Sequence, residues 1–546
     1  MNWESSRSAS AGYIVRTFDL SQMIRRSLAL LSCLHCVAAA GSAQNVQARP
    51  PRLVVFFTVD QLRPDYFDRF ASQLTGGLAR LSRGGAFFPN GFQDHANTET
   101  APGHASTLSG RFPRGTGIVA NSAGVLDPQA PLVGDPGPGA SPYRFRGSAL
   151  IDWMRIKNPA SRALSVSRKD RGAILPLGRA HQNVYWYSGS RFTTSTYYRD
   201  TLPDWVKQFN ARRLPQRLAG TAWDLLLPPN AYPEPDSVVT ESVGREFVFP
   251  HRISADSARA GAMAQETPMM DEITLAFALA GLQTLSIGAS DSATDLLAVS
   301  LSSTDAVGHR YGPDSRELHD QIVRLDRSLG KFLDSLFVLR DSTRIVIALT
   351  ADHGVSPVPG SKSRDPNEGA GFVDPSAALQ AFMTPLRARG IDNTVVDFSI
   401  DMLLMDRVAV AAHGLDPDSL ARAFSATIGA VPGVLRADLV SQLTRQDTTK
   451  DYVARRWLHM LPPDVPAAVA VTLKPYWFWE GLPIATHGSP HDSDARVPII
   501  FWGHSVKPGR QSRVARVVDI APTLAAILNV APLERLDGQV LREVIR

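Results

Sequence analysis

The segment Leu53-Val-Val-Phe-Phe-Thr-Val59, followed by Asp60, decides the fold class of this 546-residue chain. A continuous run of apolar and β-branched residues is typical of a strand buried on both faces of a parallel sheet. Residues 295–301 and 344–350 repeat this pattern, and segments with helical spacing, such as residues 316–339, lie between the strands. Strands that alternate with helices predict an α/β fold with a mostly parallel central sheet flanked by helices.

Two long segments interrupt this alternation. Residues from about 185 to 268 are rich in aromatics and proline, and residues from about 357 to 480 form a second irregular stretch. We expect both to be insertions that cap the core of a catalytic domain spanning residues 44–546. The alternation resumes with a strand near residues 497–502 and a helix near residues 518–528.

The N-terminus has the features of an export signal. Two arginines at 25–26 precede an apolar run over residues 27–40, and Gly41-Ser42-Ala43 offers a small-residue cleavage site. We therefore predict a signal peptide over residues 1–43, with Met23 as an alternative start. The apolar run is too short to span a bilayer comfortably, so no stable membrane insertion is expected after cleavage. The alternatives are an attached amphipathic helix and a lipid anchor. The mature protein is expected to be periplasmic or secreted.

Cysteine and charge content narrow the chemistry. Cys33 and Cys36 are the only cysteines, and both lie inside the predicted signal. Any metal ligands of the mature chain must then be histidines and carboxylates. The formal net charge of +5 is small for this length, and no long basic run is present. Nucleic acid is therefore not expected as a partner.

Acidic and histidine residues follow three of the predicted strands: Asp60, Asp305, and the pair Asp352-His353. In open α/β sheets, ligands bind outside the carboxyl ends of the strands. Asp305 and His309 are four residues apart, so on one helical turn their side chains point the same way and can share an ion.

Thr100 and His487 complete a set of residues suited to metal-assisted chemistry. Thr100 stands just before Pro102, and threonine at an N-cap with proline in the first turn is a common helix start. Such a helix end attracts anions. Three aspartates, three histidines and a threonine are the residues needed for two divalent ions with a hydroxyl nucleophile between them.

These motifs resemble those of the alkaline phosphatase superfamily. The resemblance rests on Asp60, Thr100-Ala-Pro-Gly-His104, Asp305-x-x-x-His309, Asp352-His353-Gly354 and His487-Gly-Ser-Pro490, and it runs from about residue 53 to residue 528. The motifs are most similar to the branch with a threonine nucleophile. That branch includes nucleotide pyrophosphatases/phosphodiesterases and the phosphate-irrepressible alkaline phosphatases.

The resemblance implies a role for each motif residue. Thr100 would be the nucleophile, and Asn121, in Gly117-Ile-Val-Ala-Asn121, would contact the phosphate. Two Zn²⁺ ions would bind, one to Asp305, His309 and His487, and the other to Asp60, Asp352, His353 and the Thr100 oxygen.

The Lys169-Asp170-Arg171 segment resembles the cationic pair of the phosphate-irrepressible monoesterases. A monoester carries about two charges near neutral pH, so a lysine and a forked arginine suit it better than a diester. We expect an alkaline phosphatase that hydrolyses small-molecule phosphate monoesters through a phosphothreonine. The alternatives are a phosphodiesterase or nucleotide pyrophosphatase with the same metals and a non-catalytic phosphoester-binding protein. A sulfatase is disfavoured, because the mature chain has no cysteine to become formylglycine.

Overall fold

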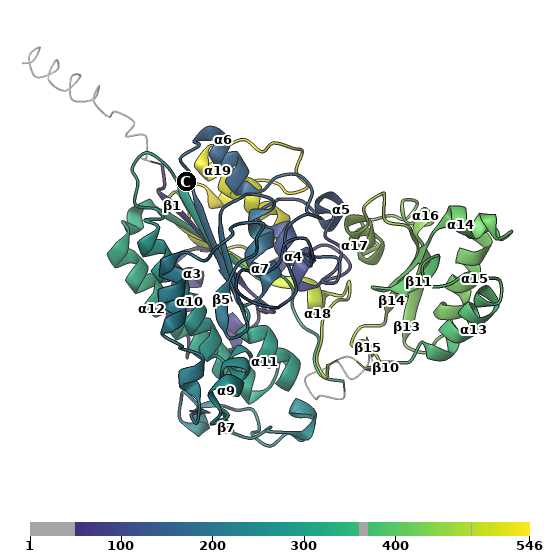
Figure 1. The fold of residues 1–546 in the computed structure, drawn as a ribbon, viewed down its shortest axis with the longest axis horizontal. Helices are drawn as coiled ribbons and strands as arrows, with labels where there is room; N and C mark the ends of the chain where they lie inside the picture. Colours follow the sequence, from purple (N-terminus) through teal and green to yellow (C-terminus); the bar gives the residue numbers. More distant parts are fainter. Residues whose placement is uncertain (1–49, 360–369, 482) are drawn as a thin grey trace, which may run out of the picture. The chain divides into compact units, whose positions relative to one another are not determined.

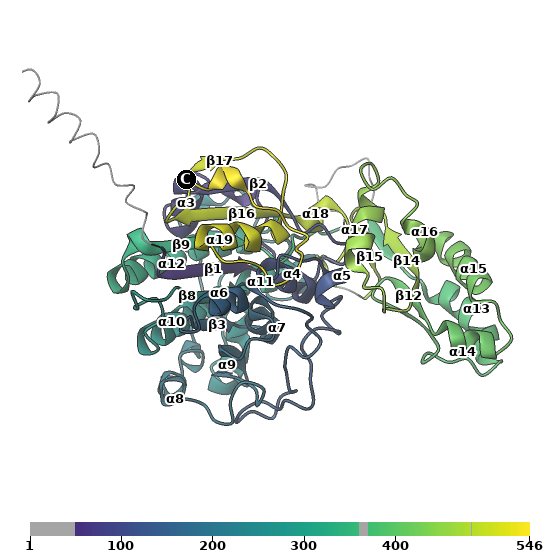
Figure 2. The ribbon, with the colours of Figure 1, turned by 90° about the horizontal axis from the view of Figure 1, so that it is seen from above.

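A mixed sheet organises the chain, with strand order β17-β2-β16-β9-β1-β8-β3-β4-β5, and β18 also pairs with β2. Figure 1 shows the ribbon, and the strands from β17 to β3 can be followed in Figure 2. Strands β3, β8, β1 and β9 run parallel to one another, whereas β16 is antiparallel to both of its neighbours. The strands are β1 (Leu53–Val59), β2 (Ala86–Phe92), β3 (Ala163–Ser167), β4 (Asn183–Ser188), β5 (Arg191–Thr193), β8 (Asp295–Leu301), β9 (Ile345–Thr350), β16 (Arg496–Gly503), β17 (Gly509–Arg510) and β18 (Ala515–Arg516). The expected α/β fold with a mostly parallel central sheet is confirmed.

This computed structural model describes residues 50–359, 370–481 and 483–546. The predicted signal peptide, residues 1–43, lies outside the described residues. Within those ranges, no helix combines the length and the apolar character needed to cross a bilayer.

Helices cover both faces of the sheet (Figures 1 and 2). One face carries three helices that pack on one another: α3 (Gly77–Gly84), α10 (Met269–Thr284) and α12 (Arg316–Leu339). The other face carries α4 (Thr100–Thr107), α6 (Leu150–Lys157), α7 (Asp170–Ile174) and α19 (Ile520–Leu528). Every residue of β1, β8 and β9 is buried, as expected for strands covered on both faces. The remaining helices of this part are α2 (Tyr66–Arg69), α5 (Pro113–Thr116), α8 (Asp204–Ala211), α9 (Ser257–Met263), α11 (Ser303–Tyr311) and α18 (Asp492–Ala495).

Residues 64–83 have the apolar spacing of a helix in the sequence, but the structure divides them into two helices, α2 and α3. The Asp326 carboxylate of α12 accepts hydrogen bonds from the amides of Thr75, Gly76 and Ala79, at 2.7, 2.5 and 3.0 Å. A Cβ on Gly76 would collide with the Asp326 carbonyl oxygen. A tertiary contact therefore fixes the break, which the local pattern does not reveal.

The irregular segment expected from residue 185 begins later in the structure. Strands β4 and β5 still belong to the central sheet, and the aromatic residues of β4 are packed in its core. Beyond them, only the short pair β6 (Ala222–Trp223) and β7 (His251–Arg252) forms strands up to residue 268.

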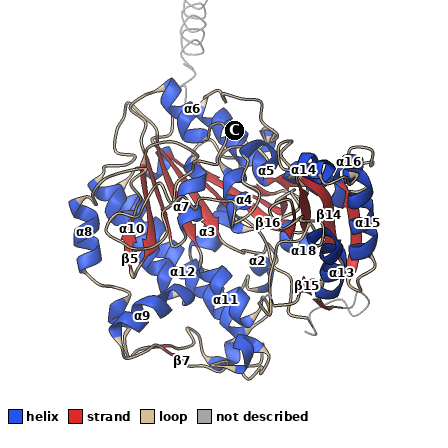
Figure 3. Cartoon of the chain, turned by 45° about the vertical axis from the view of Figure 1, so that its right-hand side comes forward, coloured by secondary structure: helices blue, strands red, loops and turns tan. Residues whose placement is uncertain are grey.

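The segment after β9 builds a separate antiparallel sheet with strand order β11-β12-β14-β13 (Figure 3). Its strands are β11 (Val396–Ser399), β12 (Met402–Met405), β13 (Val434–Leu439) and β14 (Ala467–Leu473), with β10 (Gly371–Val373) and β15 (Trp477–Trp479) pairing alongside. Its helices are α13 (Ser376–Arg387), α14 (Arg407–Ala412), α15 (Pro417–Gly429), α16 (Val440–Leu443) and α17 (Tyr452–Met460). An apolar cluster of its own lies between this sheet and helices α13 and α15. We refer to residues 371–479 as the second insertion.

Candidate functional site

The carboxyl ends of four neighbouring parallel strands meet at one edge of the sheet, and polar residues follow each of them. Asp60 ends β1, α11 with Asp305 follows β8, Asp352 follows β9, and Lys169 follows β3. The three aspartates are buried. The sheet therefore brings together side chains that lie up to 292 positions apart in the sequence.

Thr100 is the first residue of α4, and Glu99 is the N-cap, so the expected cap position of Thr100 is off by one residue. Glu99 has the extended backbone of a cap residue, whereas the Thr100 hydroxyl is directed to other partners. Thr100 Oγ1 lies 3.4 Å from His353 Nε2 and 3.3 Å from Lys169 Nζ. Gly103 permits this close approach, because a Cβ there would collide with the Asp352 carbonyl oxygen.

Asp60, Asp352 and His353 form a compact, fully buried group whose ligand atoms all lie within 4.8 Å of one another. His353 Nε2 lies 3.3 Å from Asp60 Oδ1 and 3.7 Å from Asp352 Oδ2. His353 Nδ1 is 3.0 Å from the Gly354 carbonyl oxygen, so a proton on Nδ1 leaves the Nε2 lone pair facing the two carboxylates.

Asp305, His309 and His487 form a second group beside the first. His309 Nε2 lies 3.1 Å from Asp305 Oδ1 and 3.2 Å from His487 Nε2. The Nδ1 atoms of both histidines face backbone carbonyls, those of Ala485 and Thr98, at 2.8 Å. Protons on Nδ1 leave the Nε2 lone pairs of His309 and His487 free and directed toward the space beside Asp305. Metal-binding imidazoles have this arrangement.

His353 lies close to both groups. The His353 ring stacks on the His487 ring with 3.4 Å between centroids. The ligand atoms of Asp305, His353 and His487 also lie within 4.8 Å of one another. The two groups therefore form one continuous cluster of oxygen and nitrogen ligands.

The electrostatics of this cluster fit cations. Burial, followed by the charges of Asp305 and Asp352, raises the pKa of Asp60. Burial also opposes ionisation of Asp305, but Lys169 and His309 outweigh it and hold the pKa of Asp305 well below its usual range. Both carboxylate oxygens of Asp60 and Oδ2 of Asp352 are buried and accept no hydrogen bond of good geometry, although Lys169 Nζ lies 2.5 Å from Asp60 Oδ2 and His104 Nδ1 lies 3.1 Å from Asp352 Oδ2. Buried oxygens of this kind are costly unless a cation or donor satisfies them, so the residues present suit a pair of divalent ions.

The three predicted phosphate-binding residues line one cavity of about 500 Å³ together with Thr100, Asp305, His309 and His487. Asn121 accepts a hydrogen bond from the Ala101 amide at 2.9 Å, which places it beside the start of α4. Lys169 Nζ lies 2.5 Å from Asp60 and 2.7 Å from Asp305, so its ammonium contacts the carboxylates of the cluster. The Arg171 guanidinium is 3.5 Å from Asp170.

Two residues that support the cluster were not predicted. Gln61 donates from its backbone N–H to Asp352 at 3.2 Å and from its side-chain Nε2 to Asp305 at 3.0 Å, and so links the two groups. Gly308 provides the space, because a Cβ there would collide with the Gln61 side chain. The available signal was the position of Gln61 directly after a strand-end aspartate.

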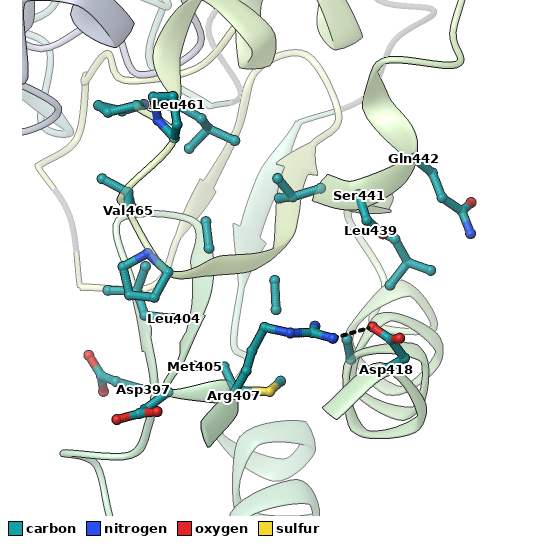
Figure 4. A pocket seen from close by; sticks show the side chains of 18 of the residues that line it. Asp397, Leu404, Met405, Arg407, Asp418, Leu439, Ser441, Gln442, Leu461 and Val465 are labelled. Carbon is teal, nitrogen blue, oxygen red and sulfur yellow. Dashed lines mark hydrogen bonds and ion pairs between the residues drawn. The ribbon is translucent and has the colours of Figure 1, made fainter. Parts of the chain in front are cut away.

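A larger cavity, of about 1320 Å³, lies in the second insertion (Figure 4). It is lined by side chains from β12, α14, α16 and the segment before β14, including Leu404, Arg407, Gln442 and Val465, and by Arg114 of α5. Arg407 and Asp418 form an ion pair of 2.9 Å across part of it. None of its lining residues belongs to the metal-type cluster, so the strand-end cavity is the candidate active site.

Comparisons with known proteins agree with this geometry. The chain is 31% identical to the alkaline phosphatase PhoK of a Sphingomonas species, over 91% of this chain and 92% of that protein. It is 30% identical to the alkaline phosphatase PhoV of Synechococcus elongatus, over 94% of this chain and 98% of that protein. The crystal structure of the wild-type alkaline phosphatase PafA matches with a TM-score of 0.83 and 27% identity, covering 91% of this chain and 99% of that one.

A model of the family described as type I phosphodiesterase/nucleotide pyrophosphatase matches residues 54–424, which is more than half of the chain. The chain therefore belongs to the type I phosphodiesterase/nucleotide pyrophosphatase family of the alkaline phosphatase superfamily, as its sequence motifs predict.

Proposed function

We propose that this protein is an exported, zinc-dependent alkaline phosphatase that hydrolyses small-molecule phosphate monoesters through a phosphothreonine at Thr100. The relatives that cover most of the chain are named alkaline phosphatases, which supports the reaction class. The periplasmic or secreted location rests on the predicted signal peptide.

The proposed ligand sets are the two groups of the cluster. Asp305, His309 and His487 would hold one zinc ion, and Asp60, Asp352, His353 and the Thr100 oxygen would hold the other. Zinc supplies Lewis-acid chemistry: it lowers the pKa of a bound hydroxyl and stabilises negative charge on oxygen.

The chain's own residues position and stabilise the reacting phosphoryl group. Thr100 Oγ1 attacks phosphorus in line with the leaving oxygen, and water then hydrolyses the phosphothreonine. Asn121 offers its side-chain amide to a non-bridging oxygen, while Lys169 and Arg171 offer charged donors. Because the transition state of phosphoryl transfer is loose, positioning and charge account for most of the rate acceleration.

One observation carries the proposal: the Thr100 hydroxyl lies at the cavity wall within 3.4 Å of both His353 Nε2 and Lys169 Nζ. A nucleophile needs a group that favours its deprotonated form, and here imidazole and ammonium both adjoin the hydroxyl.

The proposal is tested by trapping the intermediate. Acid quench during turnover, followed by peptide mass spectrometry, should find phosphate on the peptide at Thr100, and Thr100→Ala should lose nearly all turnover. Thr107→Val is the matched control, because the Thr107 hydroxyl lies on the same helix but donates to the His104 carbonyl at 2.7 Å. Phosphate on Ser106 or Thr107, or full activity of Thr100→Ala, would contradict the proposal.

A phosphodiesterase is the second candidate, because the matching family model carries that name. The two are separated by the ratio of kcat/KM for p-nitrophenyl phosphate to that for its bis-ester. In a monoesterase, replacing Lys169 and Arg171 together with alanine should lower kcat/KM far more for the monoester, since one such donor is worth about 10²–10³ in rate. Equal losses on both substrates would favour the diesterase.

A further inference from the structure

Four cationic side chains line the cavity that contains Thr100: Arg168, Lys169, Arg171 and Arg310. Three of them already have carboxylate partners, and for Arg171 this partner is Asp170 at 3.5 Å. Lys169 contacts Asp60 and Asp305, as described above. The Arg310 guanidinium lies 2.9 Å from Glu246 and 3.4 Å from Glu266.

Arg168 differs from the other three because it forms no ion pair among the described residues. Its Nε is buried without a hydrogen-bond acceptor, as is the Nε of Arg171. Burial raises the pKa of the nearby Asp271 to about 6, and the charge of Arg168 opposes that rise. Asp271 already accepts hydrogen bonds from the Ser303 amide at 3.1 Å and from Gln321 at 3.0 Å. The Arg168 guanidinium, which lines the active-site cavity, thus has N–H donors that pair with no carboxylate among the described residues.

The proposed reaction does not need this additional cation. The charge of one phosphoryl group is matched by the metal cluster together with Asn121, Lys169 and Arg171. Leaving a buried guanidinium N–H without an acceptor is costly, and a forked arginine is suited to a second oxyanion.

We propose that Arg168 forms a subsite for a second phosphate group, carried on the leaving-group side of the substrate. The favoured substrates would be compounds with two nearby phosphates, such as bisphosphates of small alcohols. This inference rests on the proposed phosphatase function and names a substrate class for it. The alternative is that Arg168 serves only to balance the charge of Asp271.

Ethylene glycol monophosphate and ethylene glycol bisphosphate provide a matched pair of substrates, since they differ only in the second phosphate. In the zinc-loaded protein, Arg168→Gln should lower the ratio of kcat/KM for the bisphosphate to that for the monophosphate by about tenfold or more, which is the loss of one charged hydrogen bond. An equal loss on both substrates would overturn the proposal, because it would mean that Arg168 only stabilises the site through Asp271.

Arg310→Gln is the matched control, because Glu246 and Glu266 already offset that charge. This variant should leave the ratio within about twofold, by the small worth of partly exposed ion pairs. A tenfold fall in Arg310→Gln would assign the preference to the cavity's overall charge and refute the assignment to Arg168. If Arg168→Gln does not fold, Arg168→Lys keeps the charge but loses the fork, and it should still lower the ratio several-fold; an unchanged ratio would contradict the proposal.

Binding separates this inference from the proposed function. Isothermal titration calorimetry on zinc-loaded Thr100→Ala should show tighter binding of the bisphosphate than of the monophosphate, and the added Arg168→Gln change should remove that difference. Absence of turnover in the unaltered protein would refute the phosphatase proposal, whereas equal affinities for the two ligands would refute the Arg168 subsite.

Discussion

The position of Lys169 predicts that its contribution to stability depends on the metal. Its ammonium is almost buried and lies 2.5 Å from Asp60 and 2.7 Å from Asp305, which are both buried carboxylates. In metal-free protein this cation balances charges that bound ions would otherwise balance. We therefore expect Lys169→Met to destabilise the metal-free protein far more than the zinc-loaded protein.

The size of the effect follows from the burial of the pair. Removing one partner of a buried ion pair costs about 3–5 kcal/mol, because the other charge stays uncompensated. An unfolding entropy of about 2.1 cal/mol/K per residue gives roughly 1 kcal/mol/K for about 500 residues. The melting temperature of Lys169→Met should therefore fall by about 3–5 °C in chelator, and by about 1 °C or less with zinc.

The assay is thermal unfolding followed by circular dichroism, with and without chelator, on the unaltered protein, Lys169→Met and Lys331→Met. Lys331 is an exposed lysine on α12 and controls for the loss of one positive charge. An equal fall of the melting temperature in chelator and in zinc would refute the reasoning, since Lys169 would then support the fold in some other way.

Three further predictions concern metal content, a buried ion cluster and pH. His309→Ala should bind one zinc ion fewer per chain by elemental analysis, whereas His413→Ala, at an exposed site, should keep the full content; equal content in both would contradict the ligand assignment. Buried Asp94 forms ion pairs with Arg455, Arg456 and Arg516, of which Arg456 is itself buried. Asp94→Asn should therefore cost about 3–5 kcal/mol in denaturant unfolding, because it removes one partner of a buried ion pair; a change under 1 kcal/mol would argue against a stabilising role of these pairs. Burial, with the charges of Glu317 and Asp236, raises the pKa of Glu241 from 4.5 to about 9. The folded state then holds a proton that the unfolded state releases, so stability falls as pH rises between these values. Glu241→Gln should flatten that fall in urea titrations across the same range, and an unchanged slope would contradict the assignment.

The sequence indicated the strand-end chemistry because short motifs encode it. A buried strand followed by aspartate, and an i, i+4 pair such as Asp305 and His309, are local patterns, and parallel pairing alone brings them to one edge. In the structure the ligand atoms of Asp60, Asp352 and His353 lie within 4.8 Å of one another, as do those of Asp305, His353 and His487. His309 Nε2 lies 3.1 Å from Asp305 Oδ1.

Features that depend on distant partners were not accessible from sequence. Gln61 links Asp352 to Asp305 across 291 and 244 positions, and its place after a strand-end aspartate does not identify these two partners. The break between α2 and α3 depends on Asp326 in the same way. Lys169 was expected at the phosphate, but only the fold shows that its ammonium also reaches the cluster carboxylates.

The second insertion contains a larger cavity than the candidate site, but its clearest link to that site is a set of ion pairs. Asp94, six residues before Thr100, forms ion pairs with Arg455 at 3.1 Å, Arg456 at 3.3 Å and Arg516 at 2.9 Å. Burial opposes ionisation of Asp94, but Arg455 and Arg456, together with His459, outweigh it and hold the pKa of Asp94 well below its usual range.

Two of these arginines lie on α17 of the second insertion, whereas Arg516 lies on β18 of the central sheet. The apolar side chains of Ala96 and Val119 also pack against Trp457 of α17. The loop that leads to Thr100, the proposed nucleophile, is thus held both by the second insertion and by the central sheet. A catalytic hydroxyl must be held within a fraction of an ångström of its productive position. Removing the ion pairs of Asp94 should therefore lower turnover, although no proposed metal ligand is changed.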